Sequence, residues 1–181
     1  MPNIKPVDSS RTDTKTAAAL DAAKRKLGLL PNLFTTLANA PAAFAGYLQF
    51  NEALAGGRLS PKQRESIALA VAQENGCGYC LSAHTAIGKM VGLSDAELRD
   101  ARRGSASDRT DGAIVAFAQR VARARGKVSA TELDALRQIG IDDGLIIEVI
   151  AHVALNVLTN YVNNVAATEI DFPRVDLDAA A

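Results

Sequence analysis

The sequence has no tryptophan, and aromatic residues make up only 4% of its 181 residues. Its apolar residues are mostly Ala, Leu, Ile and Val, which favours close-packed helices over an aromatic-rich β-sandwich. Neither an alternating β pattern nor a glycine-rich phosphate loop is found along the chain. The sequence therefore predicts an all-α protein, and a chain of this length is expected to form a single compact multi-helix domain.

The chain also lacks an excess of charge of either sign, because 20 Lys and Arg residues balance 20 Asp and Glu residues. Such a chain has no broad electrostatic field to hold phosphate backbones or anionic lipid. The amino terminus has no apolar signal region, and the longest apolar stretch, 145–158, is interrupted by Glu148, His152 and Asn156. We therefore expect a soluble, cytoplasmic protein that binds neither nucleic acid nor membranes.

Capping signals divide most of the chain into helices. Capping boxes, in which a serine precedes a Gln or Glu by three positions, begin at Ser60, Ser94 and Ser129. Prolines, glycines and acidic caps mark the remaining ends. Helices are predicted over about 13–27, from 31, over 41–56, 60–74 and 77–91, from 94, over 111–125, from 129, and over 142–168. Residues 1–12 are expected to be an extended arm, residues 13–173 the helical domain, and residues 174–181 a frayed tail.

The last predicted helix has apolar residues around its whole circumference rather than along one stripe. Such a helix needs cover on all sides, which in a chain this small favours a homo-oligomer. Asn156, Asn160 and Asn163 recur in it at helical spacing, a stripe typical of solvent or of an interface. We interpret His152 in the same helix as a hydrogen-bonded core histidine rather than as a catalytic residue.

The two cysteines of the chain, Cys77 and Cys80, are too few and too close together for the disulfide framework of a secreted domain. On a helix, His84 shares a face with both. Backbone N–H groups at a helix start lower the pKa of a cysteine there, and His84 can take the proton of Cys80 or pair with its thiolate. Cys77 could then resolve a sulfenic acid on Cys80 as a disulfide, with no metal or organic cofactor.

Glu65 lies on the preceding predicted helix, on the same face as Leu69 and Ala72, so its carboxylate is expected to point inward. An inward carboxylate needs a partner, and it can accept or relay a proton, for example through a water molecule to His84. From the spacing alone, a structural salt bridge with a nearby arginine, Arg58 or Arg64, fits equally well.

Glu65 followed by Cys77-x-x-Cys80-x-x-x-His84 resembles the motif of the alkylhydroperoxidase D-like branch of the carboxymuconolactone decarboxylase-like family. The resemblance implies an all-α fold assembled into trimers or higher oligomers such as hexamers. It also implies an antioxidant peroxidase in which Cys80 becomes the sulfenic acid and Cys77 is the proton donor and resolving thiol. In this reading His84 activates Cys80, and Glu65 starts the proton relay.

The resemblance is firmest over residues 58–98, and residues 151–173 are similar to the carboxy-terminal portion of peroxidase-like members. It implies two partners, a hydroperoxide substrate and an external dithiol, which in the family can be a lipoyl-bearing protein. Tyr79 stands where the best-known peroxidase group has a histidine. We interpret Tyr79 as a candidate residue of the substrate pocket. The presence of a tyrosine in place of that histidine affects which substrate, which thiol pKa and which reductant are to be expected.

Three functions remain open at this point. The first is a thiol-dependent (alkyl)hydroperoxide reductase or related disulfide oxidoreductase. The second is a non-catalytic helical assembly module that senses oxidants or binds a metal through the two thiolates and His84, with His152 or Glu65 as fourth ligand. The third is a carboxymuconolactone decarboxylase-like acid–base enzyme that uses Glu65 and His84 and would survive replacement of both cysteines.

Overall fold

A computed structural model describes residues 1–177, except for the side chain of Lys26. Within that range the protein has nine α-helices, one 3-10 helix and no β-strand, as the composition predicts. The elements in chain order are η1 (Ser9–Arg11), α1 (Thr14–Leu27), α2 (Asn32–Leu37), α3 (Pro41–Ala55), α4 (Pro61–Glu74), α5 (Gly78–Met90), α6 (Asp95–Arg102), α7 (Arg109–Ala124), α8 (Ala130–Gln138) and α9 (Asp143–Ala166).

Local capping chemistry sets the helix starts. The three predicted capping boxes, at Ser60, Ser94 and Ser129, are all formed, with the serine side chain and the Gln or Glu side chain each bonding the other residue's backbone N–H. Helix α7 begins at Arg109, slightly earlier than predicted. The reason is Asp108, whose carboxylate accepts hydrogen bonds from two backbone N–H groups of the first turn.

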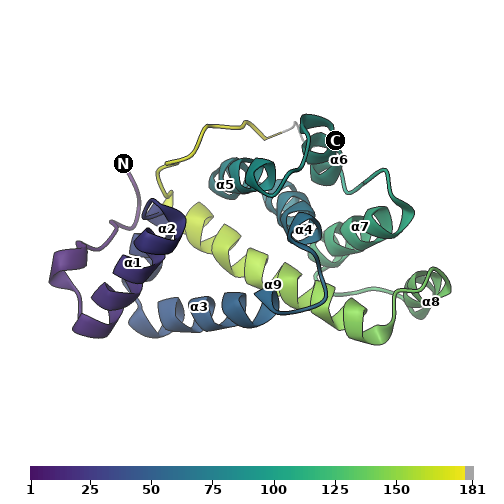
Figure 1. The fold of residues 1–181 in the computed structure, drawn as a ribbon, viewed down its shortest axis with the longest axis horizontal. Coiled ribbons are helices and arrows are strands. Elements are labelled where there is room, and N and C mark those ends of the chain that lie inside the picture. The colour runs from purple at the N-terminus through teal and green to yellow at the C-terminus, as the bar shows by residue number, and fades with distance from the viewer. Residues whose placement is uncertain (178–181) are drawn as a thin grey trace.

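Helix α4 is the central element and packs against α5, α6, α7 and α9 (Figure 1). Every residue from Ile67 to Ala72 is buried. Leu69 and Ala72 belong to a core shared with α1, α2, α3, α5 and α6, whereas Ile67 and Val71 belong to a second core shared with α7, α8 and α9. One helix therefore connects two cores, which we call the thiol core, because it contains both cysteines, and the apolar core.

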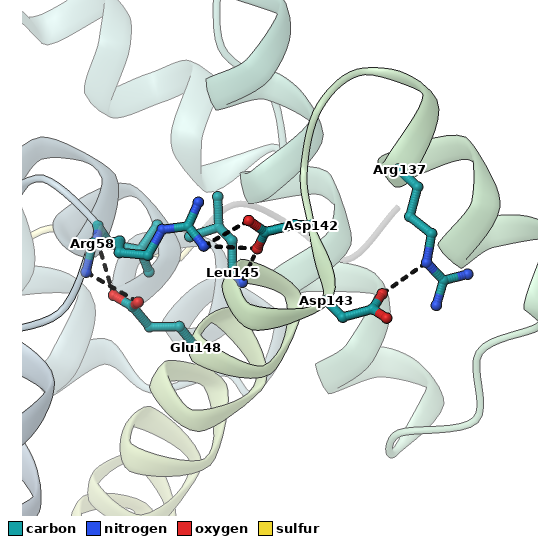
Figure 2. Close-up of polar contacts among 7 residues, drawn as sticks. Arg58, Arg137, Asp142, Asp143, Leu145 and Glu148 are labelled. Carbon is teal, nitrogen blue, oxygen red and sulfur yellow. Dashed lines mark hydrogen bonds and ion pairs between the residues drawn. The ribbon is translucent and has the colours of Figure 1, made fainter.

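Polar contacts fix the first turns of α9, as Figure 2 shows. The Glu148 carboxylate accepts hydrogen bonds from the backbone N–H groups of Arg58 and the residue after it, just before α4. The Arg58 guanidinium binds Asp142 at 2.7 Å, and Arg137 of α8 binds Asp143 at 2.7 Å. These contacts hold the start of α9 between α4 and α8, and from there α9 crosses the molecule diagonally (Figure 1).

By length and composition alone, α9 is long and apolar enough to cross a membrane. The core helix of a soluble protein meets the same criterion, and 44% of the most apolar window of α9 is buried inside the protein. Its buried residues include polar side chains as well as apolar ones, among them His152, Asn160 and Asn163.

The segments before and after the helices both contact the helical domain. In the amino-terminal arm, the N–H of Asn3 donates to the carbonyl oxygen of Ala166 at 2.7 Å. After α9 the chain turns back, and the N–H of Val175 donates to the hydroxyl of Ser82 on α5 at 3.0 Å. Of the tail expected to be frayed, residues 174–177 therefore include a contact with α5, and residues 178–181 lie outside the described residues.

Candidate active site

The two cysteines lie where α4 gives way to α5. Gly76, with a φ of 61°, makes the left-handed turn that an L side chain would resist, and Cys77 then caps α5. The Sγ of Cys77 accepts a hydrogen bond from the backbone N–H of Cys80 at 3.2 Å. Both thiols are free and buried, with exposed fractions of 0% and 2%. The predicted placement of the pair at a helix start is thus what the structure shows.

The two thiols differ sharply in acidity. The pKa of Cys80 is lowered to about 7, against the opposing effect of burial. The largest cause is the side-chain hydrogen bond from Cys77, and the charge of His84 and the side-chain amides of Asn163 and Asn160 contribute to the same lowering. The same hydrogen bond to Cys80, together with burial, raises the pKa of Cys77. Cys80 is therefore the thiol that ionises first, and Cys77 remains protonated.

His84 contacts Glu65 directly, without a bridging water. The Nδ1 atom of His84 lies 2.8 Å from Oε2 of Glu65, and their side chains are only 23% and 16% exposed. Burial opposes protonation of His84, but the adjacent Glu65 carboxylate outweighs it and raises the histidine pKa. The alternative arginine partners are engaged elsewhere, Arg58 with Asp142 and Arg64 with a backbone carbonyl before α4.

The asparagines of α9 face inward, so their interpretation as a solvent or interface stripe is wrong. Asn156, Asn160 and Asn163 are 6%, 0% and 3% exposed. The amide of Asn163 donates to the Sγ of Cys80 at 3.2 Å, and the amide oxygen of Asn160 accepts from Asn75 at 2.9 Å. Sequence reasoning missed Asn163 and Asn160 as site residues, although small amides at helical spacing in an apolar helix were the available signal.

The Tyr79 side chain connects α5 with two other parts of the chain through direct contacts. Its hydroxyl accepts a hydrogen bond from the backbone N–H of Leu33 in α2 at 3.2 Å, and its ring meets Phe172 edge-on with centroids 5.8 Å apart. Burial raises the pKa of Tyr79, so the phenol stays neutral. Where the best-known peroxidase group has a histidine, this chain thus has a neutral anchor for α2 and the carboxy-terminal segment.

A cavity of about 100 Å³ brings the predicted site residues together. Cys80, His84, Glu65 and Tyr79 all line it. Cys77 is hydrogen-bonded to Cys80 but is not among the lining residues. The cavity therefore presents one thiol, the more acidic one, to a bound molecule.

His152, interpreted from the sequence as a core histidine, is buried and lines this same cavity. Burial lowers its pKa, and its Nε2 atom has no hydrogen-bond partner. Among residues 1–177 no group of three His, Cys, Asp or Glu side chains is placed to hold a metal ion. The geometry thus does not favour the four-ligand arrangement of the metal-binding alternative.

The model of the Carboxymuconolactone decarboxylase family matches residues 41–124, the segment that contains Glu65, both cysteines and His84. Over this segment the chain is similar to that family. No curated protein matches the sequence.

Solved structures share the fold of this chain over nearly its whole length. An uncharacterized peroxidase-related protein from Ralstonia eutropha JMP134 with an alkylhydroperoxidase AhpD core has a TM-score of 0.85 at 24% identity, over 94% of this chain and 92% of that one. A peroxidase-related protein from Silicibacter sp. TM1040 has a TM-score of 0.80 at 23% identity, over 92% of each chain. The debrominase Bmp8, in complex with 2,3,4-tribromopyrrole, has a TM-score of 0.77 at 17% identity, over 93% and 91%.

Proposed function

We propose that the protein is a cysteine-dependent hydroperoxide reductase with Cys80 as nucleophile and Cys77 as resolving thiol. The observation that supports this most strongly is the asymmetry of the pair. The hydrogen bond from Cys77 is the largest of the influences that together lower the pKa of Cys80 to about 7, so near neutral pH much of Cys80 is thiolate, the reactive form of cysteine. Cys80 is also the cysteine that lines the cavity.

In the first step, the Cys80 thiolate attacks the terminal oxygen of the hydroperoxide. An S–O bond forms, the O–O bond breaks, and two electrons pass from sulfur to oxygen, which leaves a sulfenic acid on Cys80. The departing alkoxide or hydroxide takes the proton held on His84 and leaves as alcohol or water. Glu65, 2.8 Å from the ring, stabilises the protonated imidazole before this transfer.

In the second step, the Cys77 thiol attacks the sulfur of the sulfenic acid. The disulfide forms, and the hydroxyl group leaves with the Cys77 proton as water. An external dithiol, of the lipoyl type in this proposal, then reduces the disulfide and restores both thiols, and the Cys80 proton returns to His84. The cycle needs a reducing compartment, which fits a cytoplasmic antioxidant enzyme.

The size of the cavity favours a hydroperoxide over a halogenated ring as the molecule that Cys80 attacks. The debrominase Bmp8 has the same fold, so attack of Cys80 on an aryl bromide is the nearest competing reaction. A cavity of roughly 150 Å³ is the size that holds benzene. The cavity beside Cys80, at about 100 Å³, is smaller than that. A tribrominated ring therefore fits less well than a hydroperoxide.

The function is tested by thiol counting and intact mass after one equivalent of hydrogen peroxide, on wild type and on Cys77→Ser with dimedone present. Serine is a favoured N-cap, so this variant keeps the start of α5. We expect wild type to lose two hydrogens and both thiols, and Cys77→Ser to gain one dimedone adduct at Cys80. If both thiols stay free and unmodified, the proposal fails, and acid–base chemistry by Glu65 and His84 becomes the leading account.

Assembly into a homo-oligomer, such as a trimer or hexamer, belongs to the same proposal. Apolar side chains on the outer side of α9 are exposed, with Ile147 at 64%, Leu158 at 40%, Tyr161 at 56% and Val165 at 65%. Their separations of eleven, three and four positions place them on one helical face. A second copy of the chain would cover this face. Sedimentation equilibrium on wild type and on Val165→Glu tests the assembly, which the variant should weaken.

A further inference from the structure

His152 lies at the wall of the cavity and carries an unsatisfied polar atom. The residue lies on α9 and is only 4% exposed, and its Nε2 atom is buried with no hydrogen-bond partner. It lines the same cavity as Cys80 and His84. A buried polar atom without a partner costs free energy, and such atoms call for an explanation. A bound molecule that hydrogen-bonds to the ring would supply the missing partner.

Other polar side chains of α9 and α3 line the cavity together with His152. Asn156, one turn further along α9, and Tyr47 and Asn51 of α3 line the cavity. The Asn156 amide donates to the carbonyl oxygen of His152 at 2.8 Å, which fixes the two residues relative to each other. We call His152, Asn156, Tyr47 and Asn51 the amide wall. The cavity thus has a second polar wall besides that of Cys80, His84 and Glu65.

The groups of the amide wall are uncharged. Burial lowers the pKa of His152, and the charge of Arg64 lowers it further against the opposing influence of Glu148, the Leu54 carbonyl and Glu65. Burial raises the pKa of Tyr47 to about 12. A neutral imidazole has one N–H donor and one acceptor nitrogen, and a phenol also has both functions. Such a wall suits a neutral molecule with polar atoms at both ends.

The cavity limits the size of that molecule. Its volume is about 100 Å³. One water molecule needs about 10–15 Å³ of such volume, and a cavity of roughly 150 Å³ holds benzene. Hydrogen peroxide and short-chain alkyl hydroperoxides therefore match the cavity better than the aromatic ring of cumene hydroperoxide does.

We propose that the amide wall, with His152 as its main hydrogen-bonding residue, binds the O–H group of the substrate and restricts the enzyme to small hydroperoxides. This rests on the proposed function and adds to it a substrate-binding residue and a substrate class. While the Cys80 thiolate bonds to the terminal oxygen, the Nε2 atom of the neutral His152 ring accepts a hydrogen bond from the O–H of that oxygen. The leaving oxygen still receives its proton from His84, so the balance of the reaction is unchanged.

The test compares His152→Leu and His152→Gln with wild type in kcat/KM for hydrogen peroxide and cumene hydroperoxide, with dihydrolipoamide as reductant. Loss of a hydrogen bond made in the transition state predicts a fall of about 10- to 100-fold for His152→Leu with hydrogen peroxide. His152→Gln, which keeps an acceptor, should recover part of that loss. Wild type should prefer hydrogen peroxide to cumene hydroperoxide by at least about 10-fold.

Thr168→Val is the matched control, because its hydroxyl is also buried without a partner but lies outside the cavity. It should leave kcat/KM unchanged, and all variants should keep the wild-type rate of Cys80 alkylation, which needs no bound peroxide. A wild-type rate in His152→Leu, or equal rates with both peroxides, overturns this inference while the proposed function stands. If wild type turns over neither peroxide, the proposed function itself fails.

Discussion

The two cores that meet at α4 differ in what they bury. The apolar core, between α4, α7, α8 and α9, is built from aliphatic side chains and one phenylalanine. The thiol core contains Cys77, Tyr79 and Cys80 among its apolar members, and polar side chains such as His84 and Asn163 contact them or lie close by. Helix α4 thus places Ile67 in a core that contributes to stability. It places Glu65 in a region whose polar contacts shift the pKa values of Cys80 and His84.

The difference indicates how such a small domain separates two tasks. Burial of aliphatic groups is favourable in proportion to area and needs no orientation. The groups near Cys80 act through oriented contacts, such as the 3.2 Å bond from Asn163 and the 2.8 Å contact of His84 with Glu65. Substitutions in the apolar core should therefore change stability and leave thiol chemistry intact, and substitutions at the site should do the reverse.

The largest effect is expected from Cys80→Ser. Removal of the nucleophile should lower dithiol-dependent peroxide reduction by at least about 1,000-fold, because the binding pocket alone cannot replace the reacting thiolate. Serine is nearly isosteric, so the thermal midpoint should shift by only a few degrees. Coupled peroxide consumption and a melting curve measure both. Retention of more than a tenth of the activity would rule out Cys80 as the nucleophile.

Ile67→Ala tests the apolar core. Ile67 is fully buried in the apolar core, and truncation of such a residue costs about 2–5 kcal/mol of unfolding free energy. Urea denaturation followed by circular dichroism measures the loss. Below the transition, the pH profile of Cys80 alkylation should match wild type, and a shifted profile would show that the two cores are not separable.

Glu65→Gln should lower peroxide reduction by about 100-fold, the scale of a lost proton-transfer partner. The amide keeps the shape but removes the charge that raises the pKa of His84. His84 then holds its proton only at lower pH, so the activity of the variant should fall at a lower pH than that of wild type. The comparison is made by pH–rate profiles of kcat/KM, and identical profiles would contradict the assigned role of Glu65.

Asn163→Ala should raise the midpoint of Cys80 alkylation by about one pH unit from a wild-type value near 7. The lost amide bond stabilises the thiolate, so without it a higher pH is needed to ionise the thiol. Iodoacetamide labelling from pH 5 to pH 10 gives the midpoint. Asn164→Ala is the matched control, since the Asn164 amide bonds the Asn75 carbonyl instead. Equal midpoints in the two variants would refute the thiolate contact.

The smallest effect is expected from Ser129→Ala. The change removes the cap of α8, at the edge of the apolar core, and should cost about 1 kcal/mol of unfolding free energy. Peroxide reduction should be unchanged, and urea denaturation with the activity assay tests both. A loss of activity here would mean that α8 influences the thiols across the molecule.

Helix boundaries could be predicted where local chemistry decides them. The capping boxes at Ser60, Ser94 and Ser129 contain all of their partners within three residues, so the sequence alone reveals them. Asp108 caps α7 without the matching Gln or Glu, and its role was missed. The thiol motif and His84 could be identified because spacing within one helix determines a shared face.

The rest depends on how helices cross, which spacing does not determine. Periodicity shows that Asn156, Asn160 and Asn163 share a face, but only the packing of α9 across α5 shows that this face is buried. The contact of Glu65 with His84 joins two helices and residues 19 positions apart. From the sequence, a salt bridge between Glu65 and an arginine was therefore as plausible as this contact. For the same reason His152 could be predicted as buried but not as part of the cavity.

The most direct test of the account is site-resolved alkylation of the two cysteines in the wild-type protein, measured by peptide mass spectrometry from pH 5 to pH 10. We predict that Cys80 reacts with a midpoint near pH 7, because its thiolate forms there, and that Cys77 stays unmodified over most of the range. Equal reactivity with an ordinary midpoint of about 8.5 for both, or earlier reaction of Cys77, would contradict the assignment of Cys80 as the nucleophile.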